Sequence, residues 1–130
     1  MGFTYTWDDP DNLSVMRFTA TDPWTWNDYH KAVRMALFTL HNHPQPVDLI
    51  IDLSPATRLP GGALAHVRSF GKRLNPSMTG RVIVIGLDAE IEARLRAGRD
   101  ERVLQMQDRT IYFADDEAAA QAILNQLRDA

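Results

Sequence analysis

The sequence predicts a single α/β domain over residues 1–130, in which helices pack on one mixed β-sheet. Three observations predict this class. Apolar and polar residues alternate over residues 3–7, as in a half-buried strand. Two continuous apolar runs, over residues 47–53 and 81–86, are typical of central strands that are covered on both faces. Segments with helical periodicity separate the later strands, and parallel strands need such crossovers.

The first part of the chain predicts a β-hairpin followed by an amphipathic helix. Strands over residues 3–7 and 13–20 flank the turn-forming sequence Asp-Asp-Pro-Asp-Asn. Thr25 is the expected cap of the helix, and Asp28 supplies the acidic partner of a capping box three residues later. The helix runs to about residue 41, because Pro44 and Pro46 follow. Its apolar face consists of Tyr29, Val33, Ala36, Leu37 and Leu40.

The remaining segments alternate strand and helix. A helix is expected from about residue 60 to Asn75-Pro76, with an apolar stripe of Ala63, Val67, Phe70 and Leu74. After the strand over residues 81–86, Asp88 caps a short helix to about residue 97, and residues 99–108 either extend this helix or loop back. Residues 110–113 form the last strand, and acidic residues start the last helix, which buries Ala119, Ile123 and Leu127. The order is β-β-α-β-α-β-α-β-α, with the last three strands parallel and the hairpin at an antiparallel edge.

Composition excludes several classes of protein. The chain contains no cysteine, so it has no disulfide, thiolate metal site or cysteine nucleophile. Its net charge of -3 argues against a nucleic-acid-binding protein, which would carry a basic surface. The sequence has no signal-peptide pattern and no apolar stretch that approaches the roughly 20 residues needed to span a bilayer. We therefore expect a cytoplasmic location.

The junction after the strand over residues 47–53 is the expected binding edge, because ligands of open α/β sheets bind outside the carboxyl ends of the strands. Gly61 and Gly62 leave the start of the next helix without side chains, so its N–H groups can hold a phosphate, a carboxylate or an acidic side chain. Arg58 and His66 are placed to assist. Alternatively, the two glycines only permit a tight turn, with Pro60 at the first helical position.

Polar residues of the same junction complete the candidate site. Asp52 and Ser54 are expected to hydrogen-bond the amides of their own loop. No catalytic or metal-binding residue is assigned, because the chain lacks the glycine-rich loops and the serine elbow of known enzyme classes, and its His-Asn-His sequence has no third ligand nearby. We expect a protein that is not an enzyme and that needs no cofactor. The candidate binding site consists of Asp52, Ser54, Thr57, Arg58, Pro60, Gly61 and Gly62.

The element order and the motif Asp52-Leu53-Ser54, followed by glycines at the expected helix start, resemble the STAS family. This is the fold of bacterial anti-sigma-factor antagonists and of the cytoplasmic tails of sulfate transporters. The resemblance covers residues 13–127 and implies a protein-interaction module in signalling. In that family a partner kinase phosphorylates the serine of an Asp-Ser-x-Gly motif at the helix start. That Asp-Ser pair falls on Pro60 and Gly61, which accept no phosphate, so the switch is either absent or moved to Ser54, Thr57 or Ser69.

Two further groups of residues are candidate interfaces. Trp24 and Trp26 flank the helix cap, and exposed tryptophan is enriched in protein interfaces. Alternatively, both rings cover the edge of the sheet. Arg68, Lys72 and Arg73 form a basic cluster that is either a contact face or a solvated face of a helix.

Two functions remain open from the sequence. The first is a non-enzymatic interaction module that binds a protein partner through residues 59–65 and the helix after them. The second is a small-ligand sensor, in which an anion or a lipid occupies a pocket above the strand ends. The first predicts a filled core and an exposed apolar or charged patch, whereas the second predicts a cavity bordered by residues 55–62 and by the neighbouring loops at the strand ends. Self-association into a homodimer is compatible with either function.

Overall fold

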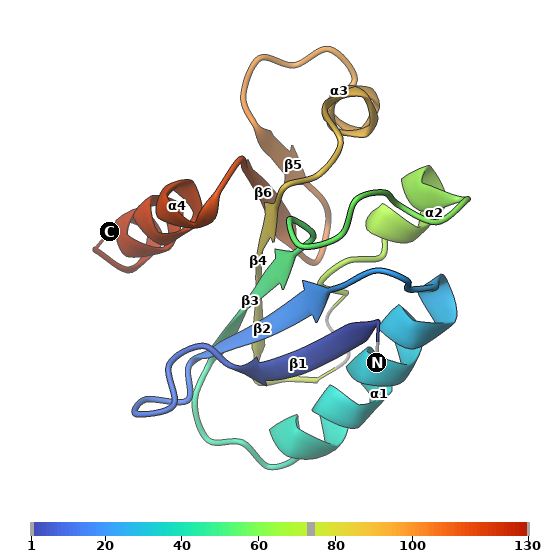
Figure 1. Cartoon of the computed structure of the whole chain (residues 1–130). Helices are drawn as coiled ribbons and strands as arrows, with labels where there is room; N and C mark the ends of the chain where they lie inside the picture. Colours follow the sequence, from blue (N-terminus) through green and yellow to red (C-terminus); the bar gives the residue numbers. More distant parts are fainter. Residues whose placement is uncertain (1, 73–74, 130) are drawn as a thin grey trace.

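The computed structural model describes residues 2–72 and 75–129, which form six strands and four helices (Figure 1). All six strands belong to one sheet, in the order β1-β2-β3-β4-β6-β5. The elements in chain order are β1 (Phe3–Trp7), β2 (Val15–Ala20), α1 (Trp26–Leu40), β3 (Val47–Asp52), α2 (Ala63–Val67), β4 (Met78–Ile85), α3 (Ala89–Arg96), β5 (Val103–Gln105), β6 (Thr110–Ala114) and α4 (Glu117–Asp129).

Strand pairing confirms the expected mixed α/β sheet. β2, β3, β4 and β6 run parallel, and β1 pairs with β2 in the antiparallel direction, as the hairpin pattern predicts. β5 corrects the expected order, because it pairs antiparallel with the outer edge of β6, where the sequence predicts a helix extension or a loop. This strand has only three residues, and its pairing depends on the edge that β6 offers rather than on a local pattern.

Helices cover both faces of the sheet. α1, α2 and α3 lie on one face, and α4 lies on the other (Figure 1). Alternate residues of β3 divide between the two cores: Leu49 and Ile51 belong to the larger core, whereas Ile50 packs in the core under α4. The expectation that this strand is buried on both faces is therefore confirmed. The buried residues of α4 are Ala120 and Leu124, next to the predicted stripe, whose members are half-buried.

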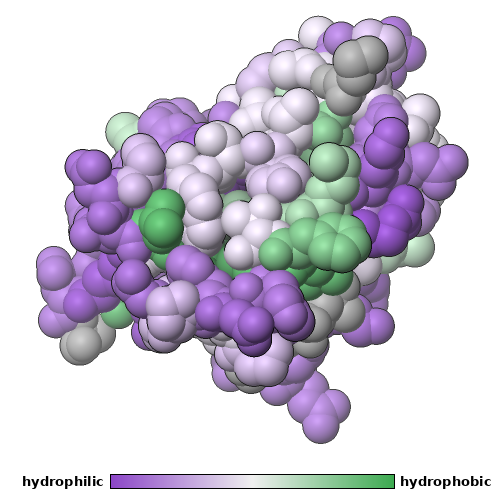
Figure 2. Space-filling view, turned by 90° about the horizontal axis from the view of Figure 1, so that it is seen from below, coloured by the Kyte–Doolittle hydropathy of each residue, from purple (hydrophilic) through white to green (hydrophobic). Residues whose placement is uncertain are grey.

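α1 begins and ends as predicted. Thr25 accepts a hydrogen bond from the Asp28 backbone N–H (3.2 Å), and the Asp28 carboxylate accepts one from the Thr25 N–H (2.9 Å). The helix ends at Leu40, before the two prolines. Its outer face carries Met35 and Phe38, which are 50% and 83% exposed. Figure 2 shows an apolar patch on the side of the molecule that carries this helix.

α2 is much shorter than the sequence predicts. It spans Ala63–Val67, and its cap is Gly62, in the left-handed conformation with a φ of 82°, so Pro60 does not occupy the first helical position. Turns continue to Gly71, whose φ of 71° again belongs to the left-handed region that glycine adopts without strain. α2 is thus limited to little more than one turn, between its cap Gly62 and Arg68, and only turns follow as far as Gly71. Leu74, the last member of the predicted stripe, lies outside the described residues.

Buried carboxylates tie α3 and α4 to the rest of the fold. Glu92 on α3 is 3% exposed and accepts two hydrogen bonds from Arg102, just before β5 (2.9 and 2.7 Å). Asp48 on β3 is also 3% exposed, and Arg128 of α4 donates to it (3.0 Å). Such pairing is required, since an unpaired buried charge is strongly destabilising. The Glu92 contacts hold α3 in the position from which its first turn borders the candidate site.

Candidate functional site

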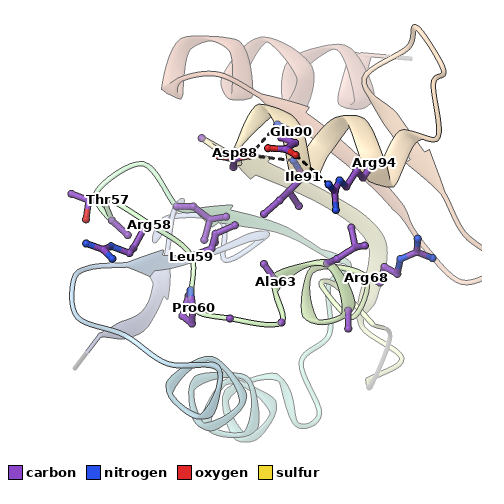
Figure 3. Close-up of a pocket in the computed structure, with 17 residues that line it drawn as sticks. Thr57, Arg58, Leu59, Pro60, Ala63, Arg68, Asp88, Glu90, Ile91 and Arg94 are labelled. Carbon is purple, nitrogen blue, oxygen red and sulfur yellow. Dashed lines mark hydrogen bonds and ion pairs between the residues drawn. The ribbon is translucent and has the colours of Figure 1, made fainter.

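The loops that follow β3 and β4 border a hollow of about 1020 Å³ (Figure 3). One wall is the segment 53–65, which contains most of the predicted site, and the opposite wall is formed by the first turns of α3. β3 and β4 are parallel neighbours, so their carboxyl ends meet at one edge of the sheet and bring the two loops together. The hollow therefore lies where the sequence predicts the binding edge.

The inner surface of this hollow is apolar. Leu59 and Leu64 come from the segment after β3, and Ile91 comes from α3; all three are half-buried and pack against the larger core. In Figure 3, Leu59 and Ile91 lie on opposite walls of the hollow. Partly exposed apolar side chains in a concave site provide contact surface for an apolar group of a bound molecule.

Charged side chains surround the apolar surface. Arg58, Arg68 and Arg94 line the hollow and are exposed. Arg94 pairs with Glu90 (3.2 Å), and Asp88 accepts hydrogen bonds from the first amides of α3 (3.0 and 3.2 Å). No salt bridge joins Arg58 or Arg68 to another residue in the described part of the chain. The lining therefore carries three arginines against the two carboxylates of Asp88 and Glu90, and the carboxylate of Asp22 lies near Arg58.

Asp52 and Ser54 form the turn that the sequence predicts. One carboxylate oxygen of Asp52 accepts hydrogen bonds from the Ser54 N–H (3.0 Å) and from the Ser54 hydroxyl (2.6 Å). The other oxygen contacts Arg17 (3.3 Å), which also contacts Asp8 (2.7 Å) and Glu117 (2.6 Å) and lowers the pKa of the Glu117 carboxyl. Neither Asp52 nor Ser54 lines the hollow. These two residues position the loop after β3, which leaves contact with a bound molecule to the residues that follow.

Thr57 joins the loop after β3 to the loop before α1. Its N–H (2.8 Å) and its hydroxyl (2.5 Å) both donate to one carboxylate oxygen of Asp22. These hydrogen bonds, with the nearby charge of Arg58, lower the pKa of the Asp22 carboxyl. The hydroxyl of Thr57 is thus engaged in holding the wall of the hollow.

One interpretation of the sequence places Gly61 and Gly62 at a helix start whose N–H groups bind an anion, and the geometry does not support it. α2 has five residues, so few peptide dipoles align at its start. The carbonyl oxygen of Gly61 accepts the indole N–H of Trp26 (2.8 Å), and Gly62 takes the left-handed conformation. A Cβ added at Gly61 would meet no atom within 4 Å, so this residue faces open space. The geometry supports the alternative in which the glycines permit a tight turn.

Trp24 and Trp26 are buried, which favours the alternative in which both rings cover the edge of the sheet over the one in which a ring is exposed. They are 6% and 8% exposed and pack edge-to-face, with ring centroids 4.8 Å apart. Trp24 also packs on Phe3 of the edge strand β1 (5.0 Å), and Trp26 stacks flat on His66 of α2 (4.6 Å). Rings of this size bury a large area where they pack. The tryptophans therefore cover the sheet edge and hold α2, and they present no surface to a partner.

The predicted basic cluster does not form one face. Arg68 lines the hollow beside α2, Lys72 lines a separate hollow between α1 and the sheet, and Arg73 lies outside the described residues. Ser69, one of the alternative phosphorylation positions, is half-buried and donates to the His66 carbonyl oxygen (2.6 Å). Across residues 2–72 and 75–129, no three His, Asp or Glu side chains are grouped so that they could hold a metal ion.

The sequence predicts neighbouring strand-end loops around a cavity, but it assigns no residue of α3 to the site. The apolar run of β4 was the available signal, because the carboxyl ends of adjacent parallel strands lie at the same edge. Side chains just beyond this run were therefore candidates for the same site. The missed lining residues are Gly86, Asp88, Glu90, Ile91 and Arg94.

Comparisons of the chain with models of protein families, with curated proteins and with solved structures found no match. Among the described residues, no helix has the length and apolar character needed to cross a membrane. The chemistry of the hollow is therefore the basis on which a function can be assigned.

Proposed function

We propose that this chain is a non-catalytic regulatory module, resembling the STAS family, that binds a protein partner in the hollow beside α2. The composition of the hollow carries the proposal: a half-exposed apolar inner surface lies beside Arg58 and Arg68, which form no salt bridge with described residues. A partner segment with apolar side chains flanked by Asp or Glu complements this surface in both polarity and charge.

Binding suits these residues better than catalysis does. The hydroxyl of Thr57 donates to Asp22, the carboxylate of Asp88 caps α3, and Glu90 pairs with Arg94. Each of these groups is engaged in the protein's own structure. A general base needs a free acceptor within hydrogen-bond reach of the proton that it removes, and the described lining of the hollow offers none beside a nucleophile.

Docking in this proposal does not depend on phosphorylation at the start of α2. Pro60 and Gly61 occupy the positions of the Asp-Ser pair of the STAS family, and neither accepts a phosphate. Gly61 faces open space at the rim, so a partner can approach the backbone there without meeting a side chain. The module would then act by binding alone.

Short synthetic peptides test the proposal. Two peptides share a central Leu-Phe-Leu sequence and differ only in their flanks, which are Glu in one and Lys in the other. Amide chemical shifts of isotope-labelled protein report where each peptide binds. The Glu-flanked peptide is expected to shift amides of residues 56–65 and 88–94, and the Lys-flanked peptide is expected to bind more weakly because the rim is positive.

Gly61→Asp and Gly61→Ala form a matched pair of variants, because a Cβ at this position meets no atom within 4 Å. Two like charges about 4 Å apart in water repel by about 1 kcal/mol. The Glu-flanked peptide should therefore bind Gly61→Asp about fivefold more weakly and should bind Gly61→Ala as it binds the wild type. Equal affinity for the two peptides, or no effect of Gly61→Asp, would contradict the proposal.

Sensing of a small anion or a lipid in the same hollow is the second candidate function. Its support is the volume of about 1020 Å³, which lies at the upper end of the range of about 300–1,000 Å³ for small-molecule sites. Thermal unfolding in the presence of single anions and lipids distinguishes the two functions. Stabilisation by one ligand class, weakened by Gly61→Asp, together with no binding of either peptide, would favour sensing.

A further inference from the structure

A second hollow, of about 270 Å³, lies between α1 and the sheet. Val33 and Leu37 of α1, Leu49 of β3 and Met78 of β4 contribute to its walls, which continue the larger core. None of its described lining residues borders the hollow beside α2, so the two are separate sites. A hollow of this composition resembles small-molecule sites, whose walls are mostly apolar and whose polar groups are few.

The charged group of this hollow is Lys72. His30 and Ser69 also line it, but Ser69 already donates to the His66 carbonyl oxygen (2.6 Å). Burial, with the nearby charges of His66 and Arg34, lowers the pKa of His30, so its ring is neutral at neutral pH. Lys72 is exposed and forms no salt bridge with another residue that the structure describes. Its ammonium group is thus available to an anion at the solvent side of an apolar hollow.

We propose that this hollow binds an unbranched carboxylate with a short hydrocarbon chain. The chain lies against Leu37, Leu49 and Met78, and the carboxylate lies near Lys72. A volume of about 270 Å³ holds about nine groups of the size of a water molecule, at about 30 Å³ each, which matches the size of octanoate.

Calorimetric titration of the full chain with octanoate, octanol and octylamine tests this inference. Octanoate is expected to bind most tightly and octylamine least, since the three share one chain and differ in the charge that meets Lys72. Lys72→Gln should weaken octanoate binding about fivefold, as expected for an exposed ion pair, and should leave octanol binding unchanged. Lys31→Gln, at an exposed position of α1 that does not line the hollow, is the matched control and should change neither affinity.

Substitutions that fill the hollow test whether octanoate binds there rather than elsewhere on the protein. Val33→Trp places an indole in the cavity and should abolish binding of octanoate and of octanol. Leu37→Phe serves the same purpose if Val33→Trp does not fold. Absence of octanoate binding to the wild type, equal affinity for octanoate and octylamine, or retained binding in a folded filled variant would each overturn the inference. Gly61→Asp should leave octanoate binding unchanged, so this result is independent of the peptide experiment.

Discussion

Replacement of Gly71 by alanine tests how closely the turns after α2 pack on the sheet. Gly71 has a φ of 71°, and a Cβ at this position would collide with Cγ2 of Val82, a fully buried side chain of β4. The left-handed conformation costs about 1 kcal/mol for a residue with a Cβ, and overpacking of a core typically costs about 1–3 kcal/mol. We expect Gly71→Ala to lower the free energy of unfolding by about 2–4 kcal/mol.

Gly98→Ala isolates the backbone part of this effect. Gly98 has a φ of 81°, and an added Cβ would meet no atom within 4 Å, so only the conformational cost of about 1 kcal/mol applies. Urea unfolding of both variants measures the difference. In the double variant Gly71→Ala/Val82→Ala the colliding methyl group is absent, so its destabilisation should be smaller than the sum of the two single effects. The reasoning is refuted if Gly71→Ala and Gly98→Ala agree within about 0.5 kcal/mol.

Three further substitutions test contacts elsewhere in the fold. Asp48→Asn removes the charge that Arg128 contacts at 3.0 Å and should lower the free energy of unfolding, measured in urea, by about 2 kcal/mol. An unchanged free energy of unfolding would show that the ion pair contributes nothing to stability. Trp26→Phe removes the indole hydrogen bond to Gly61 (2.8 Å), so amide hydrogen exchange in α2 should accelerate. Equal exchange rates in the wild type and the variant would show that this hydrogen bond does not hold α2 in place. Burial lowers the pKa of His30 from 6.5, so the folded protein binds fewer protons than the unfolded chain. The free energy of unfolding should therefore fall as the pH drops from above 6.5 through the lower, folded pKa of His30. This fall should be smaller in His30→Gln, and an identical pH dependence of the two proteins would refute the explanation.

Elements that carry their own local signal were predictable. The reciprocal hydrogen bonds of Thr25 and Asp28 define the start of α1, and the continuous apolar runs define β3 and β4. The turn of Asp52 and Ser54 was predictable for the same reason, since a short polar side chain bonds the amides next to it. Each of these features depends on residues that are close together in the chain.

Features that depend on distant partners were not predictable. β5 exists as a strand because β6 offers an edge to it, and the sequence over residues 103–105 has no alternation of its own. The ring of Trp26 is buried because Phe70 and His66 pack against it, which no pattern around residue 26 indicates. No local pattern in the sequence of α3 indicates that this helix forms a wall of the candidate site.

By itself, the sequence determines most strands and helices, the caps of α1 and α3, and the edge of the sheet at which a partner is expected. The tertiary structure decides how long α2 is, that both tryptophans are buried, and that a hollow between α1 and the sheet accompanies the one beside α2. The physical reason is the range of the interactions involved. Caps and apolar periodicity act within a few residues, whereas a hollow is formed by side chains from segments that only the pairing of parallel strands brings together.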